Sequence, residues 1–173
     1  MSEMKAEKTE NIFVLAPVMT KDEATDMYLK RQRKLWMLKS QALPDDVVLL
    51  YKPYFLFEYL LKVQIFNKKR LNNATVIVDG LSGVPALVKD NISMCASGKQ
   101  GIRGKIVNLD ISLEEANQNA LDLLYKITYS KYTLFPQCTL QKNKVIYRGF
   151  YQFVYDKKRK CNFISADSYS LTS

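Results

Sequence analysis

Aromatic and apolar residues dominate two separate stretches of this chain, and a short basic run divides each stretch in two. The first stretch covers residues 51–83 and is divided by Asn67–Arg70. The second covers residues 147–171 and is divided by Asp156–Arg159. Apolar runs separated by a few polar residues are typical of β-hairpins, so we expect a hairpin in each stretch, with the basic run as its turn.

A helix is predicted before each hairpin. Thr20–Glu23 and Ser112–Glu115 have the spacing of a capping box, in which a hydroxyl and a carboxylate bind free amides of the first helical turn. Apolar residues then recur at helical spacing over residues 21–39 and 113–129. The expected buried stripes are Ala24, Met27, Tyr28, Leu35 and Leu38 in the first helix, and Leu113, Ala116, Ala120, Leu124 and Ile127, widened by Leu121 and Leu123, in the second.

The order strand, helix, hairpin occurs twice, which predicts an internal duplication. The predicted fold class is α+β, with two copies of a strand–helix–antiparallel β-sheet unit and each helix packed on one face of its sheet. The first short strand is expected within Ile12–Met19. The predicted divisions are a disordered lead at residues 1–11, a first repeat at 12–88, a linker at 89–104 and a second repeat at 105–173. A compact pseudo-twofold pair is favoured, and whether the copies share one sheet stays open.

The longest apolar stretch, residues 47–66, exceeds the usual length of a strand, so a break is expected at Lys52–Pro53. Because side chains alternate along a strand, one face of this stretch is apolar and is expected to face the core. That face carries Phe55, Phe57, Tyr59, Leu61 and Val63.

Two short motifs accompany the repeated order. Glu23–Ala24 in the first helical turn is followed by Val78–Gly83, VDGLSG, at the closing turn. Glu115–Ala116 is followed by Ala166–Asp167, where Ser168–Leu171 replaces the glycine turn. These motifs resemble the PepSY domain family, in which a Glu-Ala helix packs on a small antiparallel sheet whose strand ends in an Asp-containing turn. The resemblance covers most of the chain and implies a non-catalytic binding or inhibitory module, known in that family beside peptidases and in membrane or envelope proteins.

The chain has 173 residues, of which 47% are hydrophobic, and its 26 basic and 17 acidic residues give a formal charge of +9. This length can bury a core as one large domain or two small ones. The positive charge favours acidic partners such as nucleic acid, anionic lipid or an acidic protein face, and it also serves solubility. We find no signal peptide or spanning run, so a soluble, cytoplasmic protein is expected, with export by a route without a cleaved leader left open.

The sequence offers little for catalysis. It contains no histidine, the commonest general base and metal ligand at neutral pH. Cys95, Cys138 and Cys161 lack the spacing of a zinc site and are expected to be reduced, and the last two are interpreted as buried side chains rather than nucleophiles. Asp79 and Asp167 are interpreted as turn caps rather than a catalytic pair. We therefore expect no enzymatic activity, no cofactor and no metal.

Two sets of residues are candidates for binding. The first is the pair of basic runs expected at the hairpin tips, Lys68, Lys69, Arg70, Lys157, Lys158, Arg159 and Lys160. The second is the strand aromatics, including Tyr54 and Tyr151, which would stack on bases or hold a peptide if one face of their strands were open. Basic turns also keep hairpins soluble, and aromatic residues also fill sheet cores. The sequence favours a non-enzymatic protein- or peptide-binding accessory module of inhibitory or regulatory role, and the alternative is a nucleic-acid-binding protein that uses the basic tips.

Overall fold

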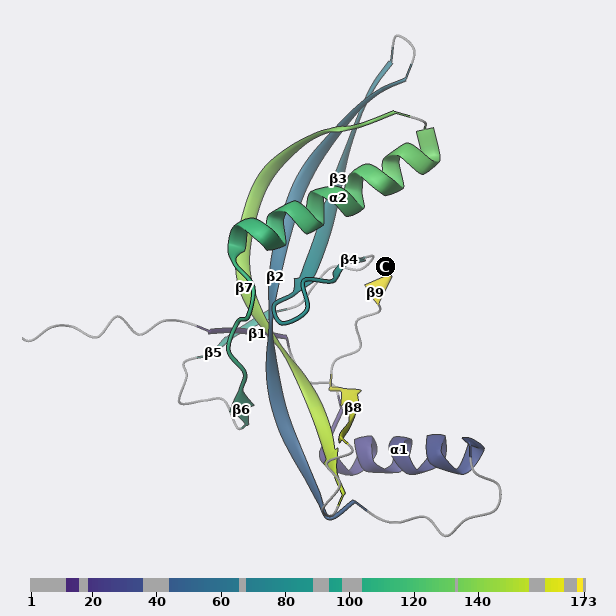
Figure 1. Ribbon diagram of the computed structural model, residues 1–173, viewed down its shortest axis with the longest axis vertical. Helices are drawn as coiled ribbons and strands as arrows, with labels where there is room; N and C mark the ends of the chain where they lie inside the picture. The colour runs from purple at the N-terminus through teal and green to yellow at the C-terminus, as the bar shows by residue number, and fades with distance from the viewer. Residues whose placement is uncertain are drawn as a thin grey trace, which may run out of the picture.

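The computed structural model describes residues 12–15, 19–35, 44–65, 68–88, 94–97, 104–132, 134–155, 161–166 and 171–172. These residues form an α+β fold with two helices and one mixed sheet (Figure 1). In chain order the elements are β1 (Ile12–Leu15), α1 (Lys21–Leu35), β2 (Asp46–Ile65), β3 (Lys68–Asp79), β4 (Pro85–Val88), β5 (Met94–Ser97), β6 (Lys105–Ile106), α2 (Leu113–Tyr132), β7 (Gln137–Val154), β8 (Cys161–Ser165) and β9 (Leu171–Thr172).

A long antiparallel ladder between β2 and β7 forms the centre of the sheet. It runs from the pair Asp46 and Val154 to the pair Lys62 and Gln137, and it extends along much of the molecule in Figure 1. The strand order is β5-β1-β7-β2-β3-β4-β9, with β6 also paired to β2 and β8 also paired to β7. Strands from both predicted units therefore belong to one continuous sheet.

β2 is a single strand of 20 residues, so the break predicted at Lys52–Pro53 is wrong. Both residues stay in register with β7, where they face Arg148 and Tyr147. The carbonyl of Pro53 accepts a hydrogen bond from Gly80 N–H at 2.9 Å. The nitrogen of Pro53, which carries no hydrogen, faces the same edge of β2 as this carbonyl. Along that edge the pairing with β6 ends at Tyr51 and the pairing with β3 begins at Tyr54. The proline thus removes a donor at a point where the ladder does not need one.

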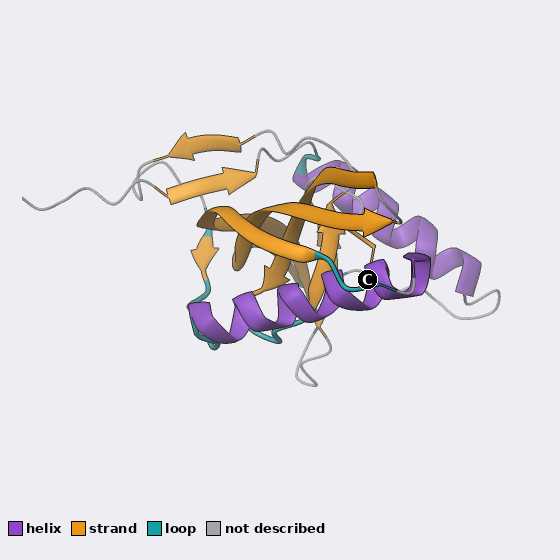
Figure 2. Ribbon diagram, turned by 90° about the horizontal axis from the view of Figure 1, so that it is seen from above, coloured by secondary structure: helices purple, strands orange, loops and turns teal. Residues whose placement is uncertain are grey.

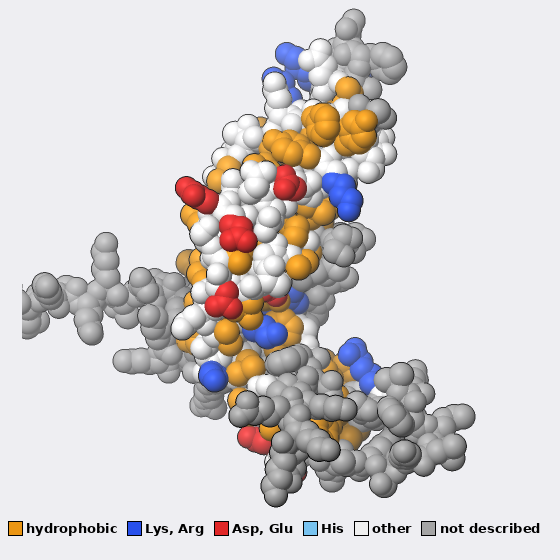
Figure 3. All heavy atoms as spheres, in the orientation of Figure 1, with side chains coloured by type: hydrophobic (Ala, Val, Ile, Leu, Met, Phe, Trp, Pro, Cys, Tyr) orange, Lys and Arg blue, Asp and Glu red, His pale blue; other side chains and the backbone are white. Residues whose placement is uncertain are grey.

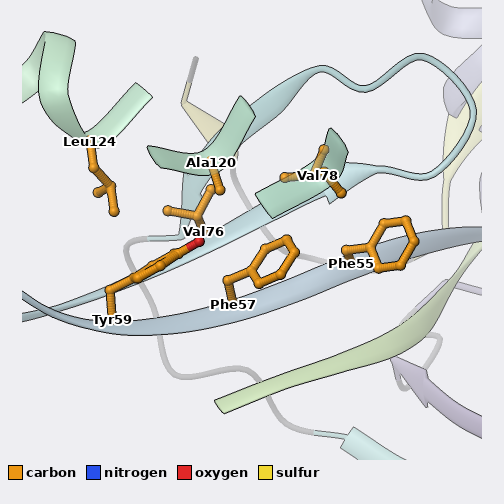
Figure 4. Close-up of a cluster of buried hydrophobic side chains, with 8 residues drawn as sticks. Phe55, Phe57, Tyr59, Val76, Val78, Ala120 and Leu124 are labelled. Carbon is orange, nitrogen blue, oxygen red and sulfur yellow. The ribbon is translucent and has the colours of Figure 1, made fainter. Parts of the chain in front are cut away.

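α2 covers one face of β2 and β3 (Figure 4). The buried cluster between α2 and the sheet consists of Phe55, Phe57 and Tyr59 of β2, Val76 and Val78 of β3, and Ala116, Ala120 and Leu124 of α2. This cluster confirms the predicted core face of β2 and the centre of the predicted stripe of α2. Leu113 and Ile127 are 47% and 37% exposed, so their inclusion in that stripe is wrong. The buried residues of α2 recur every fourth position, at Ala116, Ala120, Leu124 and Thr128. Leu113 and Ile127 lie outside this row.

α1 packs near the other end of the ladder. Its cluster consists of Ala24, Tyr28, Tyr151, Phe153, Ile164 and Ala166. The ring of Tyr28 stacks on Phe153 with 4.3 Å between the centroids. Val47 and Leu49 of β2 border this cluster and lie on the same, odd-numbered face of β2 as the residues under α2. Both helices therefore lie on one face of a strongly twisted sheet, against different parts of it (Figure 2).

Each helix packs against the hairpin from the other part of the chain. α1 precedes the β2–β3 hairpin but lies on β7 and β8, and α2 precedes β7 and β8 but lies on β2 and β3. The prediction that each helix packs on the sheet of its own unit is therefore wrong. β1 pairs in parallel with β7, and β6 pairs in parallel with β2. The chain consequently enters each helix from a position beside the other hairpin.

Several local predictions are confirmed. In the first capping box, Thr20 Oγ1 accepts a hydrogen bond from Glu23 N–H at 3.3 Å, and Glu23 Oε2 accepts one from Thr20 N–H at 2.8 Å. In the second, Ser112 Oγ accepts a hydrogen bond from Glu115 N–H at 3.1 Å. Within the predicted linker, Met94–Ser97 forms the strand β5, which pairs with β1. The sequence did not predict this strand, because four residues are too few to reveal one by alternation. The predicted disordered lead lies outside the described residues.

Candidate binding surface

The end of the β2–β3 hairpin projects beyond the rest of the sheet (Figure 1). β7 pairs with β2 only as far as Lys62, so the last three pairs of the hairpin have no third strand in the described part of the chain. These pairs are Val63 with Arg70, Gln64 with Lys69, and Ile65 with Lys68. We call these six residues the basic arm. Its three cations are exposed and occupy the first positions of β3, so the prediction that they form the turn is wrong.

Further cations lie along β2 and β7, up to seven residues from the arm, on the side of the sheet opposite α2. Lys142 of β7 pairs with Glu58 of β2, and Lys144 lies two residues further along β7 on the same side. Lys62 of β2 and Lys69 of the arm share this side, because side chains alternate along a strand. The residues under α2 occupy the opposite side. We call the surface formed by Glu58, Lys62, Lys69, Lys142 and Lys144 the open face.

Charge differs between the strands near the arm and the first half of α2. The strand segments 58–75 and 137–144 contain six cations and one carboxylate, Glu58. By contrast, the first ten residues of α2 contain three exposed carboxylates and no cation, and red side chains mark α2 in Figure 3. Four of these cations, Lys62, Lys69, Lys142 and Lys144, lie on the open face, whereas Lys68 and Arg70 of the arm point to the α2 side. Positive charge around the arm and on the open face favours approach of an anion.

Lys144 illustrates the electrostatics of the open face. Partial burial lowers the pKa of its amine, the neighbouring charge of Lys142 lowers the pKa further, and Glu58 opposes both effects. The Nζ atom lies 5.3 Å from the ring centroid of Phe13, a cation–π contact that holds the side chain against β1. An anion bound at this position would offset the repulsion between the two lysines, so the surface favours a negatively charged ligand.

An exposed aromatic cluster lies at the C-terminal end of α2. The ring of Phe135 is 70% exposed and stacks on Tyr129, with 5.0 Å between the centroids and an interplanar angle of 25°. Tyr125 contacts Phe135 edge-on, with 6.2 Å between the centroids. We call Tyr125, Tyr129 and Phe135 the aromatic cluster. Sequence reasoning missed it because Phe135 lies in the connection between a helix and a strand, where no periodic pattern singles it out.

Tyr54 and Tyr151, predicted from the sequence as binding residues, are 7% and 8% exposed. Tyr54 packs with Leu15 on one face of the sheet, and Tyr151 packs under α1 on the other. The hydroxyl of Tyr151 donates a hydrogen bond to the carbonyl of Met19 at 3.0 Å. Burial raises the pKa of Tyr151, and the nearby charge of Glu23 raises it further. Neither tyrosine offers a free ring face, and the two do not share one site.

The other sequence candidates have structural roles or lie outside the described residues. The Oδ1 atom of Asp79 accepts hydrogen bonds from the N–H groups of Leu81 and Ser82 at 2.8 and 3.0 Å, which confirms that Asp79 caps the turn. Cys138 is half-buried, and desolvation raises the pKa of its thiol, which disfavours a nucleophilic thiolate. Lys157–Lys160 and Asp167, along with the side chains of the other two cysteines, lie outside the residues whose placement is described. The described residues contain no cluster of three or more His, Cys, Asp or Glu able to hold a metal ion.

A buried cation at the centre of the ladder was also missed. Arg148 is 4% exposed, and its guanidinium carbon lies 5.3 and 5.5 Å from the ring centroids of Tyr54 and Phe150. It donates a hydrogen bond to Ser165 Oγ at 3.3 Å. Lys52, its cross-strand partner, lies 5.1 Å from the same Phe150 ring. These contacts between cations and rings stabilise the sheet, and we interpret Arg148 as structural.

No protein-family model, curated protein or solved structure matches this chain. The resemblance to the PepSY family therefore stays a prediction. Within the described ranges, neither helix is long and apolar enough to cross a membrane.

Proposed function

We propose that this chain is a non-enzymatic nucleic-acid-binding protein that contacts phosphates with the basic arm and the open face. The observation that carries the proposal is the ratio of six cations to one carboxylate across segments 58–75 and 137–144. Lysine and arginine contacts to phosphate supply most of the sequence-independent affinity for nucleic acid. A concentration of cations on one projecting part of a protein is therefore the feature expected of such a binder.

The shape of the arm supports a polymeric ligand. A two-stranded ribbon is narrow enough to enter a groove of nucleic acid or to lie along its backbone. Lys69 points toward the open face, whereas Lys68 and Arg70 point toward the α2 side, since alternate residues of β3 face opposite ways. A polyanion that passes the arm meets positive charge on both sides, whereas a small anion would meet only part of it.

Protection of strand edges is the ordinary alternative for these cations. Lysines on an edge strand hinder unwanted pairing with other chains, and this role accounts for Lys142 and Lys144 on β7 and for the cations of β3. It does not account for Lys62, which lies on β2 between those two strands. A ligand-binding role covers all six cations.

We also infer that the architecture consists of two copies of one unit. Four backbone hydrogen bonds support this, because they form two matching pairs. In each pair, one residue that follows a hairpin donates its N–H to a carbonyl of a long strand. The carbonyl of the same residue accepts a hydrogen bond from a residue two positions before a helix. The pairs are Gly80 N–H to Pro53 C=O with Ile111 N–H to Gly80 C=O, and Ala166 N–H to Gly149 C=O with Met19 N–H to Ala166 C=O. The parallel pairings of β1 with β7 and of β6 with β2 match in the same way. Superposition of residues 12–88 on residues 105–172 tests the duplication. If the two segments do not overlay, the duplication is excluded.

A protein or peptide partner is the second candidate function. Among the described strands, none pairs with the outer edge of β7 between Gln137 and Lys144, and such an edge can accept a partner strand. A register shift opposite Glu58 and Tyr59 marks a bulge in this part of β7. Bulges and lysines at an edge oppose strand addition, so this candidate is the weaker one.

The salt dependence of binding tests the proposal. Fluorescence anisotropy would measure the affinity of the purified protein for labelled DNA and RNA over a series of salt concentrations. The variant Lys68→Gln/Lys69→Gln/Arg70→Gln should bind more weakly, and its slope of log K against log salt should be shallower by about 2–3, at about 0.7–0.9 for each phosphate that the arm no longer neutralises. Exposed strand residues change stability little, so the variant should stay folded.

The matched control is Lys21→Gln/Lys30→Gln/Lys105→Gln, which removes three exposed cations far from the arm. It has the same net charge as the arm variant, so it separates local contacts from the overall charge of the protein. The proposal fails if the two variants bind alike, or if the arm variant retains the salt dependence of the parent.

A further inference from the structure

The aromatic cluster combines wide exposure with a fixed ring position. Phe135 has the largest exposed fraction among the large hydrophobic side chains that the structure describes. Its contacts with the rings of Tyr129 and Tyr125 restrict its rotation, whereas its exposure leaves most of the ring surface available. A ring held in this way is a preformed surface for a planar ligand.

The cluster lies close to the basic arm. Cys138, three residues after Phe135, pairs with Leu61 of β2, and Arg70 of the arm pairs with Val63 of the same strand. Leu61 and Val63 both point to the α2 side, and two residues of a strand span about 7 Å. Arg70 on β3 and Cys138 on β7 therefore lie on the same side of the sheet, offset by these two residues along β2 and by two strand spacings of about 4.8 Å across it. A strand of a few nucleotides is long enough to reach from the aromatic cluster to Arg70.

The surroundings of the cluster are cationic as well as aromatic. Residues 123–144 contain four lysines and no carboxylate. Lys126 and Lys131 in the last turns of α2 are exposed, and Lys131 Nζ lies 5.3 Å from the ring centroid of Tyr132. Figure 3 shows hydrophobic and basic side chains together toward the upper end of the molecule. Aromatic rings interspersed with cations are the arrangement that binds single-stranded nucleic acid, in which rings stack on bases and cations follow the backbone.

We infer that the ligand is a single-stranded nucleic acid, with a base stacked on Phe135 and adjoining phosphates bound by Arg70 and Lys68. This inference rests on the proposed function and specifies its ligand. The bases of a duplex are already paired and stacked, so they offer no free face to the ring. Every base has a π-face, so binding through this contact depends little on sequence.

Paired measurements on single-stranded and duplex DNA of equal length test the inference at one fixed salt concentration. Phe135→Ala should lower the affinity for single-stranded DNA about tenfold and leave the affinity for duplex DNA unchanged. Phe135→Trp should retain single-strand binding, and its added indole fluorescence should be quenched when the strand binds, beyond any response of the parent, whose one tryptophan is Trp36. The control is Leu113→Ala, which removes a side chain that is 47% exposed at the other end of α2 and should change neither affinity.

The outcomes separate this inference from the proposed function. Unchanged single-strand affinity in Phe135→Ala, or no quenching in Phe135→Trp, would overturn the stacking contact and leave salt-dependent binding by the arm in place. An equal loss of single-strand and duplex binding in Phe135→Ala would also overturn it, because stacking acts only on unpaired bases. If the parent binds neither nucleic acid, the proposed function itself is wrong.

Discussion

Phe57 and Phe153 allow a direct test of how the two ends of the sheet depend on each other, because each is fully buried beneath a different helix. Phe57 lies under α2 with the rings of Phe55 and Tyr59 at 6.2 and 6.0 Å. Phe153 lies under α1 and stacks on Tyr28 at 4.3 Å. Burial of a phenylalanine side chain contributes about 1.5–3 kcal/mol and each ring contact about 0.5–1.5 kcal/mol. With the cavity left behind, replacement by alanine should cost about 3–5 kcal/mol at either site.

Both substitutions should unfold the protein as one unit. β2 and β7 run the whole length of the ladder and lie under both helices, so a loss at one end is transmitted to the other. Urea unfolding followed by far-ultraviolet circular dichroism should show one transition for Phe57→Ala and one for Phe153→Ala. The melting temperature should fall by roughly 6–20 °C in each variant. Leu113→Ala, at an exposed position, should stay within about 0.5 kcal/mol of the parent.

Two separate transitions in Phe153→Ala, with α2 and its hairpin surviving the loss of α1, would refute this reasoning. It would show that the ladder does not couple the two ends. A loss below about 1 kcal/mol at either phenylalanine would refute the magnitude, since it would mean that the site collapses around the smaller side chain.

Three smaller predictions concern the hydrogen bonds of the first capping box and of Tyr59. Thr20→Ala should cost about 1 kcal/mol of unfolding free energy, measured with urea, because it removes the hydroxyl of the first capping box. Hydrogen bonds from Thr20 lower the pKa of Glu23, so the stabilisation from this carboxylate is complete above its unfolded pKa and is lost as the pH falls through the lower folded pKa. An acid titration of stability should lack this component in Glu23→Gln. Tyr59→Phe should cost about 1 kcal/mol, because the hydroxyl donates to Asn117 Oδ1 at 2.7 Å. Desolvation raises the pKa of Tyr59 from 10.0 to about 12. The stabilisation from the neutral phenol is therefore complete below pH 10 and is lost as the pH rises through the folded pKa of about 12. Phenolate absorbance would follow this titration.

Local features of the fold could be predicted from the sequence, because each depends on neighbouring residues. The capping box at Thr20, the turn capped by Asp79 and the core face that includes Phe57 are all set by spacing over a few positions. The pairing of each helix with the other hairpin could not be predicted in this way. An apolar face indicates that something must cover it, and the sequence pattern does not say which of two similar helices does so.

The binding surface was predicted only in part for a related reason. The cations of the arm stand together in the sequence, so Lys68 and its neighbours were identified. Lys62 and Lys142 lie far apart in the chain, and only the register of β2 with β3 and β7 brings them to one side of the sheet. The first half of β7 is polar and lacks alternation, so no strand was predicted there. Phe135 was missed because exposure of an aromatic residue depends on what surrounds it in the fold.

The exchange of helices between the two hairpins also bears on synthesis of the chain. The apolar strands that include Phe57 and Val78 leave the ribosome long before α2, the helix that covers them, because α2 ends only at Tyr132. Roughly 50 residues separate Val78 from Tyr132, and at about 5–20 residues per second several seconds pass before the helix is complete. During that interval the nascent chain presents a broad apolar surface. We expect a chaperone to engage it there, and ribosome-bound chains that stop before Leu113 should remain associated with the chaperone longest.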